Sequence, residues 1–397
     1  MDVMKIISVV GARPNFMKIA PFCRALERYN ANHLCLPIEH LLVHTGQHYG
    51  DRMSRSFFDE LGIPSPDINL DIGSGSHAEQ VGRTMMAVEK VLQEHQPDWV
   101  VVVGDVNATC ACAITAKKEQ IRLAHIEAGL RSGDMNMPEE VNRLVTDRLA
   151  DLLFTPDEFS SQNLRREGIE EVRIKFVGNI MIDTLEAHRE RAAMLDLPGI
   201  ITGNLLDGQV FRVPPRLIPS SYAVLTLHRP SNVDNQDVLT AFVGFLTDEV
   251  ASDMPVIWPM HPRTQKQLAL FGLWERVLHC QGLVLVQPLG YHEMLRLNMD
   301  ARIMMTDSGG LQEECCVLGT PCLTLRENTE RPVTLREHGG ASVLVGNDVT
   351  RIRLAYRATL AEVRSPQRPA LWDGKTAPRI VEEIVRACDF GRSKPNA

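Results

Sequence analysis

The feature that most constrains the fold is an alternation of short apolar runs with longer amphipathic segments along the chain. Several of the runs are uninterrupted hydrophobic stretches, as expected of strands buried on both faces of a sheet. Helical patterns fall between them, for example over 18–29, 79–95, 107–119 and 139–150. The strands are predicted over 5–10, 41–44, 99–103, 123–126, 152–154 and 174–176, and then over 222–227, 255–260, 283–286, 301–306, 322–325 and 342–344. Repeated strand–helix–strand units predict parallel α/β sheets with right-handed crossovers.

The chain has 397 residues, which at roughly 100–200 residues per domain favours two domains. The alternation pauses before residue 220 in a stretch rich in proline and glycine, which is typical of a connection. We therefore predict a domain over 1–185, a connection over 186–220, a second domain over 221–372, and a C-terminal helix and tail over 373–397. Two doubly wound, Rossmann-like domains facing each other across a cleft would place a ligand at the carboxyl ends of both sheets.

Composition excludes several classes of protein. The net charge of −8 argues against a nucleic-acid-binding or lipid-binding surface. Nine cysteines occur without a C-x-x-C spacing, so neither a metal site nor a redox motif is indicated. The first apolar run is too short for a signal peptide, and no stretch is long enough for a membrane span. We expect a cytoplasmic protein without a metal, nucleic acid or membrane partner.

Polar clusters follow the predicted strands. The loop GARPNFMK, at 11–18, matches neither a dinucleotide-binding loop nor a Walker A loop. Arg13 and the first free amides of the following helix could bind a phosphate, although a plain tight turn explains the same residues. The loop HTGQHYGDRM follows the next strand and contains Gln47 and His48. Taken singly, such polar residues more often belong to a plain turn than to a binding site.

The first half also carries a set of carboxylates at strand ends. Asp105 follows the strand WVVVV, Glu127 ends a later strand, and Glu139 and Glu140 follow Pro138 at the start of a helix. Helix capping or the helix dipole explains one such residue, but not the whole set on one rim. Several carboxylates in one dry site would raise one another's pKa and supply acid and base forms near neutral pH.

The second half offers cationic and anion-binding elements. His228 and Arg229 come at a strand end, and His261 follows the next strand. A lone histidine is usually structural, whereas a cationic one near an anion site could protonate a leaving phosphate. The segment TDSGGLQEE places two glycines and a serine at a helix start, which suits a phosphate. A ribose could meet Glu313 or Glu314 about one turn further on.

At these motifs the chain resembles the non-hydrolysing UDP-N-acetylglucosamine 2-epimerases. The resemblance runs from about residue 5 to about residue 348, and its motifs come in the order of that family: GARPNFMK, HTGQHY, VVGDVNAT, HIEAGLRSGD, MPEEVNR, VGNIMIDT, TLHRPSNVD, MHPRT, TDSGGLQEE and TERP. The resemblance implies a GT-B fold, a homodimer and no cofactor. It also implies a C-terminal helix that packs back on the first domain.

The reaction implied by the resemblance is an anti elimination of UDP to give 2-acetamidoglucal, followed by re-addition of UDP that inverts C2. Transferred residue by residue, the family's roles make Asp105, Glu127 and Glu139 the acid/base carboxylates, with His228 assisting the diphosphate. The substrate-binding residues implied are Arg13, Lys18, His261, Ser308, Gly309, Gly310, Glu314 and Arg331. Which carboxylate removes the C2 proton is left open.

The resemblance also leaves regulation and substrate open. Gln47, His48 and Arg229 match a second, activating substrate site of bacterial members, while Ser76 and His77 replace a pair that some members carry there. Close relatives act on UDP-2,3-diacetamido-2,3-dideoxy-glucuronic acid. A hydrolysing epimerase and a GT-B glycosyltransferase use the same scaffold, and a non-catalytic UDP-sugar sensor is the alternative from another class.

Overall fold

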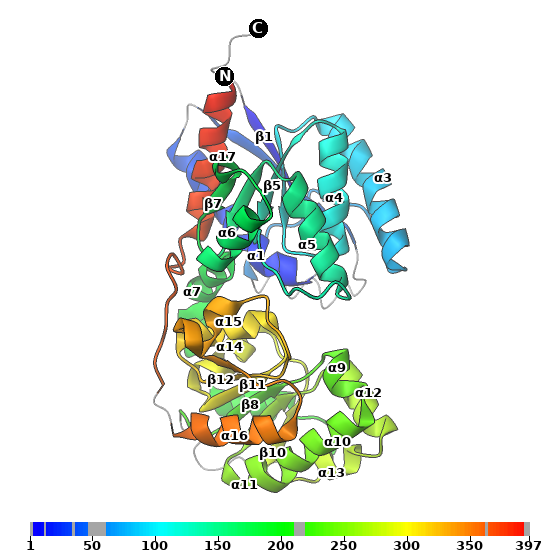
Figure 1. Cartoon of the computed structure of the whole chain (residues 1–397), viewed down its shortest axis with the longest axis vertical. Helices are drawn as coiled ribbons and strands as arrows, with labels where there is room; N and C mark the ends of the chain where they lie inside the picture. Colours follow the sequence, from blue (N-terminus) through cyan, green and yellow to red (C-terminus); the bar gives the residue numbers. More distant parts are fainter. Residues whose placement is uncertain are drawn as a thin grey trace. The chain divides into compact units, whose positions relative to one another are not determined.

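The structure is a computed structural model that describes residues 3–11, 13–33, 36–46, 61–209, 219–361 and 364–392. It divides into two compact units (Figure 1). Unit 1 comprises Met1–Glu186 together with Ala370–Ala397, and unit 2 comprises Ala187–Pro369. The chain therefore leaves unit 1, forms the whole of unit 2, and then returns to unit 1.

Unit 1 is built on a seven-stranded parallel sheet in the order β3-β2-β1-β4-β5-β6-β7. Its strands are β1 (Met4–Val10), β2 (Ile38–His44), β3 (Ile68–Asn69), β4 (Trp99–Val103), β5 (Arg122–Ile126), β6 (Leu152–Thr155) and β7 (Ile174–Phe176). Every residue of β4 is buried, because helices cover both faces of a doubly wound sheet. The core beneath these helices is made largely of valine, leucine and isoleucine.

The helices of unit 1 begin at recognisable start signals. They are α1 (Arg13–Asn32), α3 (His77–His95), α4 (Asn107–Lys118), α5 (Pro138–Leu149), α6 (Glu158–Arg166), the 3-10 turn Glu171–Arg173, α7 (Ile180–Ala193) and α17 (Thr376–Arg392). Ser76 and Glu79 form a capping box at the start of α3, Pro138 occupies the first turn of α5, and Asp157 caps α6. From Ala187 onward, α7 belongs to unit 2.

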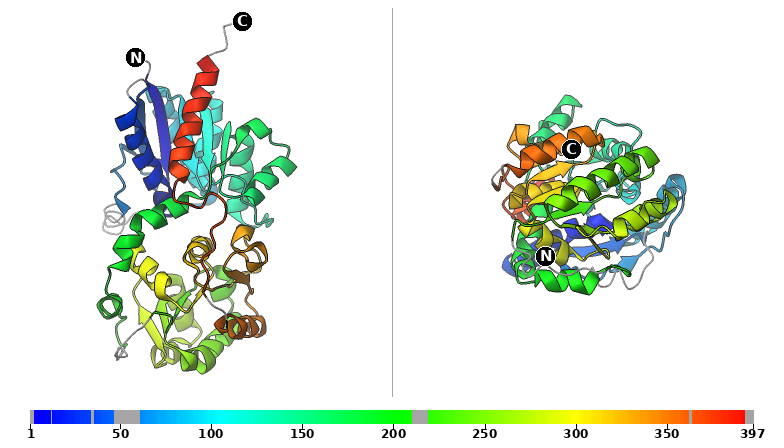
Figure 2. Two further views of the ribbon diagram at one scale, coloured as in Figure 1. Left: turned by 90° about the vertical axis from the view of Figure 1, so that its left-hand side faces the viewer. Right: turned by 90° about the horizontal axis from the view of Figure 1, so that it is seen from below.

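The returning C-terminal segment completes the core of unit 1. Helix α17 packs against α1, as the red and blue helices of Figure 2 show. Buried Asp183 accepts hydrogen bonds from the amides of Thr376 (3.0 Å) and Ala377 (2.8 Å), the first residues of α17. Gly178 has a φ of 94°, and a Cβ there would lie 2.1 Å from the carbonyl oxygen of Leu371. Only glycine therefore lets the returning segment approach.

Unit 2 repeats this architecture with a six-stranded parallel sheet in the order β10-β9-β8-β11-β12-β13. Its strands are β8 (Ala223–Thr226), β9 (Val256–Pro259), β10 (Leu283–Val286), β11 (Ile303–Thr306), β12 (Cys322–Thr324) and β13 (Ser342–Leu344). The principal helices are α8 (Leu197–Asn204), α9 (Pro230–Val233), α10 (Gln236–Phe245), α12 (Pro262–Leu270), α13 (Trp274–Leu278), α14 (Tyr291–Asp300), α15 (Gly309–Leu318) and α16 (Val349–Leu360). Unit 2 also contains a π-turn over Leu246–Val250, the short α11 (Ala251–Asp253), and 3-10 turns at Pro332–Thr334 and Arg336–His338.

The two parallel-sheet units confirm the predicted fold class, and each predicted strand is present. Strand β3 is too short to produce an alternation and was not expected. The stretch 186–220, expected as a connection, begins inside α7 and carries α8, and its Leu205 forms an antiparallel bridge with Val286 of β10. In the described part of this stretch, Pro198 lies in the first turn of α8, and Gly208 has a φ of 85° in a turn.

We expect Asp183→Ala to lower the stability of unit 1 by about 1–3 kcal/mol, because two amides at the start of α17 lose a buried acceptor. Urea denaturation checks this. The matched control is Asp348→Ala, which removes the exposed cap of α16, where Asp348 accepts from the amides of Thr350 and Arg351. Asp348→Ala should lower the free energy of unfolding by about 1 kcal/mol. An equal loss in both variants would show that the returning helix adds nothing beyond local capping.

Candidate functional site

The strand order of each sheet places a candidate site. In unit 1 the order reverses between β1 and β4, and in unit 2 it reverses between β8 and β11. The crossovers on the two sides of such a point leave toward opposite faces of the sheet, so the loops at the carboxyl ends diverge and open a crevice. The predicted site residues follow these strands.

In unit 1, an ion pair links α1, the helix after β1, to the loop after β5. Lys18 contacts Glu127 through their side chains, which are 9% and 3% exposed. Glu127 has a φ of 72°, a left-handed conformation that is uncommon outside glycine and is found at functional sites. Gly104, after β4, lies under this pair, since a Cβ there would be 3.2 Å from Lys18 Nζ and 3.1 Å from Asn15 Nδ2. The Asn15 amide donates to the carbonyl oxygen of Val103 at 2.8 Å.

A second buried cation, Arg143, joins the loop after β4 to the start of α5. Its Nη1 donates to Asp105 Oδ2 at 2.6 Å, and its Nη2 donates to Glu140 Oε2 at 2.5 Å. Glu140 also accepts from the amides of Ser132 and Gly133, both at 3.0 Å. Burial alone would raise the pKa of Glu140, but these amides and the Arg143 guanidinium hold that pKa below its usual value. Asp105 keeps a side chain that is 29% exposed.

Below the loop after β4 lies His125, a fully buried residue of β5. Its Nδ1 is 2.6 Å from Asp147 Oδ1, and its Nε2 is 2.8 Å from the carbonyl oxygen of Gly104. Asp147 Oδ2 accepts from Arg131 Nη1 at 2.7 Å, and Arg131 forms a two-pronged ion pair with Glu167. A polar network therefore supports the underside of the loop that carries Asp105.

In unit 2, His228 and Asp307 form a dyad at the ends of β8 and β11. His228 Nδ1 is 2.7 Å from Asp307 Oδ1, and the imidazole is about one-third exposed. Asp307 Oδ2 accepts from the amides of His228 (2.9 Å) and Arg229 (2.8 Å) and from Asn232 (3.0 Å). Burial would raise the pKa of Asp307, but His228 and these amides hold the pKa below its usual value. The carboxylate thereby orients the imidazole.

A second imidazole lies beside this dyad. The ring centroids of His228 and His261 are 5.6 Å apart. Burial and the neighbouring His228 lower the pKa of His261. Its Nδ1 accepts from the amide of Arg263 at 3.2 Å and so caps α12. The lowered pKa favours the neutral ring of His261 near neutral pH.

The N-terminus of α15 is surrounded by guanidinium and carboxylate groups. Ser308 is its N-cap residue, and a Cβ on Gly309 would lie 2.7 Å from Arg331 Nη1. Arg331 donates to Glu313 at 2.7 Å and contacts Glu330. Glu330 also pairs with a second guanidinium, Arg326, at 2.7 Å. Burial would raise the pKa of Glu330, but the two guanidinium groups hold it far below its usual value. The amides at the start of α15 and the two arginines make this segment suited to binding an anion.

Glu314 lies beside Glu313 in α15. It is 4% exposed, and the side chains of Tyr291 and Asn298 of α14 lie within reach of its carboxyl. Burial raises its pKa to about 7, and these two side chains only partly oppose this shift. In this structure Glu313, rather than Glu314, contacts Arg331.

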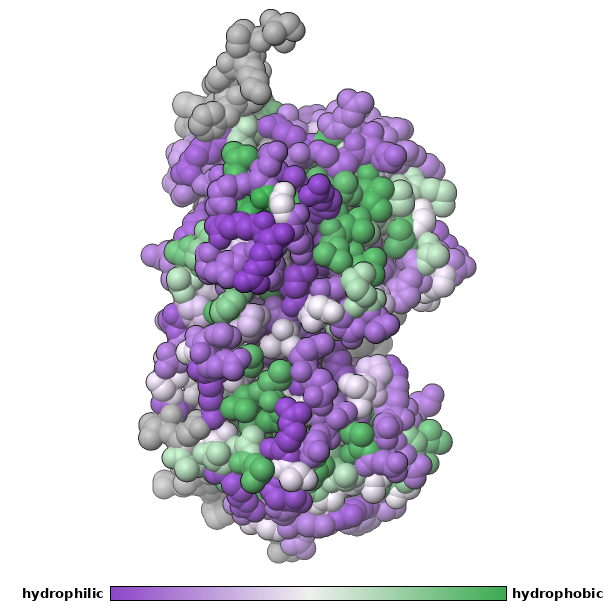
Figure 3. Space-filling view, viewed as in Figure 1, coloured by the Kyte–Doolittle hydropathy of each residue, from purple (hydrophilic) through white to green (hydrophobic). Residues whose placement is uncertain are grey.

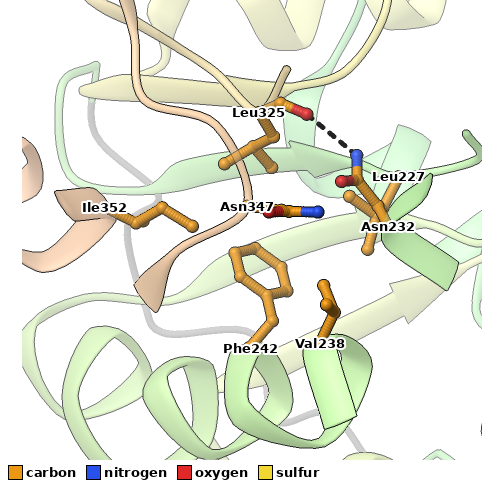
Figure 4. Close-up of a pocket in the computed structure, with 7 residues that line it drawn as sticks. All are labelled: Leu227, Asn232, Val238, Phe242, Leu325, Asn347 and Ile352. Atoms are coloured by element: carbon orange, nitrogen blue, oxygen red, sulfur yellow. Dashed lines mark hydrogen bonds between the residues drawn. The ribbon is translucent and has the colours of Figure 1, made fainter. Parts of the chain in front are cut away.

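A small pocket lies behind the His228 dyad (Figure 4). Asn232 lines it and joins the site to the core, since its Nδ2 donates to both Asp307 and the carbonyl oxygen of Leu325. The other lining residues are Leu227, Val238, Phe242, Leu325, Asn347 and Ile352. An apolar lining of this kind is suited to supporting the loop after β8 and not to holding a sugar.

The structure brings the predicted residues of each unit together, with some exceptions. Glu139 is half-buried in the first turn of α5 beside Glu140. Gln47, His48 and the side chain of Arg13 lie outside the described residues. Ser76 and His77, expected to replace a pair of the second site, cap α3 and contact Asn107, respectively. The sequence analysis missed Arg143, Asp307 and His125. Arg143 follows Glu140 at helical spacing, and Asp307 precedes Ser308 at a strand end, so spacing could have identified both.

Within the described ranges, no group of three or more histidine, cysteine, aspartate or glutamate side chains is arranged to hold a metal ion. The helices in those ranges are also too short or too polar to cross a membrane.

The raised pKa of Glu314 predicts a loss of stability as the pH rises. The unfolded carboxyl releases its proton near pH 4.5, whereas the folded one keeps it to about pH 7. Between these values the folded state binds more protons, so the free energy of unfolding falls with rising pH, by about 3 kcal/mol in total. Glu314→Gln should lack this decline. Urea denaturation near pH 5 and pH 8 tests it, with exposed Glu190→Gln as the control; an equal decline in all three proteins would contradict the shift.

The comparisons with known proteins agree on one family. A family model described as UDP-N-acetylglucosamine 2-epimerase matches residues 35–385. A UDP-N-acetylglucosamine 2-epimerase of Methanocaldococcus jannaschii is 40% identical over 98% of this chain and 100% of the relative. A UDP-2,3-diacetamido-2,3-dideoxy-D-glucuronate 2-epimerase of Pseudomonas aeruginosa is 36% identical over 96% of this chain and 100% of its own length.

A solved structure leads to the same family. The crystal structure of the Methanocaldococcus jannaschii UDP-GlcNAc 2-epimerase, in complex with UDP-GlcNAc and UDP, superimposes with a TM-score of 0.84 at 40% sequence identity. The match covers 96% of this chain and 100% of that one. With the family model matched over most of its length and a relative 40% identical across it, the chain belongs to the UDP-N-acetylglucosamine 2-epimerase family.

Proposed function

We propose that this protein interconverts UDP-N-acetylglucosamine and UDP-N-acetylmannosamine without releasing the free sugar. The observation that carries the proposal is the pair of carboxylates on neighbouring strands of unit 1, Asp105 and Glu127, each beside its own buried cation. A glycosyltransferase on the same scaffold would have no use for this acid/base set. The similarity to UDP-N-acetylglucosamine 2-epimerases along nearly the whole chain supports the same activity.

The reaction has two halves. In the first, a carboxylate takes the proton from C2 while the C1–O bond to the diphosphate breaks on the opposite face. The electron pair of the C–H bond becomes the C1=C2 double bond of 2-acetamidoglucal, and the electron pair of the C–O bond leaves with UDP. In the second, UDP adds back to C1 and C2 receives a proton on its other face. The C2–H bond is weakly acidic, so both a placed base and leaving-group stabilisation are needed.

The residues are assigned by their surroundings. Asp105, Glu127 and Glu139 are the candidate acid/base groups at C2. Lys18 contacts Glu127, and Arg143 contacts Asp105. His228, oriented by Asp307, stabilises the departing diphosphate. The glycines of the Ser308–Gly309–Gly310 turn let the backbone approach the phosphates, with Arg331 and the amides of α15 as donors. Glu314 is assigned to the ribose, His261 to the nucleotide, and Arg13 to the sugar and its diphosphate. Gln47, His48 and Arg229 are the candidates for an activating site.

A second candidate substrate is UDP-2,3-diacetamido-2,3-dideoxy-glucuronate. It is favoured by the 36% identity to the Pseudomonas aeruginosa relative that is named for this substrate. The two reactions share the C2 chemistry, so they differ only in the groups at C3 and C6 of the sugar. We also propose a cytoplasmic location, because the cysteines in the described parts of the chain are all free thiols, as expected in a reducing compartment.

The activity is tested by incubating the purified protein with UDP-N-acetylglucosamine in D2O and following the anomeric protons by NMR. We expect signals of UDP-N-acetylmannosamine and deuterium at C2 of both epimers, because each turnover exchanges the C2 proton with solvent. Glu127→Gln should slow exchange by at least about 100-fold, whereas exposed Glu94→Gln on α3 should leave it unchanged.

Other outcomes distinguish the alternatives. Free N-acetylmannosamine plus UDP would indicate a hydrolysing enzyme. Exchange only with the diacetamido uronic acid nucleotide would identify that substrate. UDP-sugar binding without exchange would indicate a non-catalytic UDP-sugar sensor.

We further propose that the protein is a homodimer that uses the α3–α5 side of unit 1. Figure 3 shows hydrophobic residues gathered over the helices at the upper right. Met86 of α3 and Met135, which precedes α5, are each 62% exposed, and Val141 of α5 is 42% exposed. Exposed apolar side chains concentrated on adjacent helices are typical of a protein interface. The family resemblance indicates a second copy of the chain as the occupant.

Sedimentation equilibrium tests this assembly. We expect a dimer for the unmodified protein and a weaker dimer for Val141→Glu, because a carboxylate would be buried without a partner. Leu354→Glu, at a residue of unit 2 that is 70% exposed, is the matched control and should not change the mass. A monomeric unmodified protein, or equal effects of the two substitutions, would refute the interface.

A further inference from the structure

His125 occupies an unusual position for a histidine, because both of its ring nitrogens face hydrogen-bond acceptors. Nδ1 is 2.6 Å from Asp147 Oδ1, and Nε2 is 2.8 Å from the carbonyl oxygen of Gly104. A neutral imidazole has one N–H and one lone pair, so it can donate to only one of them. A carbonyl oxygen cannot donate, and therefore Nε2 carries a proton.

The second proton, at Nδ1, depends on the state of Asp147. Asp147 Oδ2 accepts from the amide of Gly129 at 3.0 Å and from Arg131 Nη1 at 2.7 Å, which are contacts suited to a carboxylate. Burial by itself would raise the pKa of Asp147, but His125 and Arg131 hold that pKa below its usual value. These contacts suit an ionised Asp147, and an ionised Asp147 would need a proton on Nδ1 of His125.

The charged groups around this imidazolium balance. Asp147 of α5 meets the ring directly, Arg131 meets Asp147 from the loop after β5, and Glu167 at the end of α6 meets Arg131. Two cations and two carboxylates therefore alternate along one chain of contacts. Such a fully paired network is stable in the interior, whereas a neutral histidine would leave Asp147 with one partner fewer.

The imidazolium acts on the loop that carries Asp105. The amide of Gly104 donates to the carbonyl oxygen of Ile126 at 3.1 Å, and the carbonyl of Gly104 accepts from His125. Both ends of this residue are thus bound to β5, the strand that leads directly to Glu127. Gly104 itself has a φ of 69°, a left-handed conformation that glycine adopts readily.

We propose that His125 is a positioning residue: as an imidazolium it ties the Gly104 peptide to β5 and so sets the distance between the carboxylates of Asp105 and Glu127. The effect on catalysis rests on the proposed epimerase function. His125 itself touches no reacting atom, because it is fully buried beneath the loop.

Two substitutions separate the two contacts of the ring. Gln carries a donor where Nε2 lies, and Asn carries one where Nδ1 lies. His125→Gln keeps the donor to Gly104 and should retain kcat within about fivefold, whereas His125→Asn loses it and should lower kcat by about 10- to 100-fold. The affinity for UDP should remain within about threefold in both, because the residues assigned to UDP lie in unit 2. His40→Gln, in β2 of the same sheet, controls for loss of a partly buried imidazole.

The charge of the ring is measured directly by 15N NMR of histidine-labelled protein near pH 7.5. We expect both nitrogens of His125 to carry protons, with the signal identified by its loss in His125→Gln. His40 serves as the neutral reference in the same spectrum, because burial lowers its pKa to about 4.

A neutral His125 ring would overturn the inference, as would equal losses of kcat in the Asn and Gln variants. If the unmodified protein epimerised neither UDP-sugar, the proposed function would fail, and the spectrum would still decide the state of His125.

Discussion

A single reversal of strand order in each parallel sheet governs where chemistry can occur in this chain. In unit 1 the reversal separates β1 from β4, and Lys18 of α1 lies close to Gly104 after β4. In unit 2 it separates β8 from β11, and His228 and Asp307 meet at their ends. The strands are rich in valine, leucine and isoleucine, and most of the candidate site residues follow their carboxyl ends.

The candidate site of unit 1 is rich in carboxylates, whereas that of unit 2 is rich in cationic groups, and each is compensated by groups of the opposite charge. In unit 1, carboxylates would repel one another and take up protons if they were buried alone, and each is therefore matched by a cation, Lys18 for Glu127 and Arg143 for Asp105. In unit 2, a site for a diphosphate needs positive charge, yet uncompensated guanidinium groups are costly to bury. Glu313 and Glu330 compensate Arg331 in the described structure. A diphosphate that binds there would share or replace those contacts.

The fold class was predictable because strands buried on both faces are continuous apolar runs, as WVVVV in β4 illustrates. The strand ends in turn indicated most candidate residues. Other features were hidden for physical reasons. The two-residue β3 has no periodicity, and α8 lies in a stretch whose prolines and glycines resemble a linker. The contacts of His125 with Asp147 and Gly104 and of Arg143 with Asp105 join residues 21 to 38 positions apart in the sequence, and only the sheet brings such residues together. The roles of individual site residues stay predictions.

The return of the chain to unit 1 at Ala370 has a consequence for how the molecule is made. Unit 2 is continuous in sequence, so it can fold as soon as its own residues have left the ribosome. Unit 1 cannot, because Trp99 and Arg122 contact Cys388, and Trp372 donates to the carbonyl oxygen of Pro156 at 2.9 Å. The first 186 residues contain all seven strands of the sheet, but the part of the core that α17 covers stays exposed until Thr376–Arg392 has been made. During translation, unit 2 can therefore fold while unit 1 still lacks α17, and that exposed part of unit 1 needs protection from aggregation.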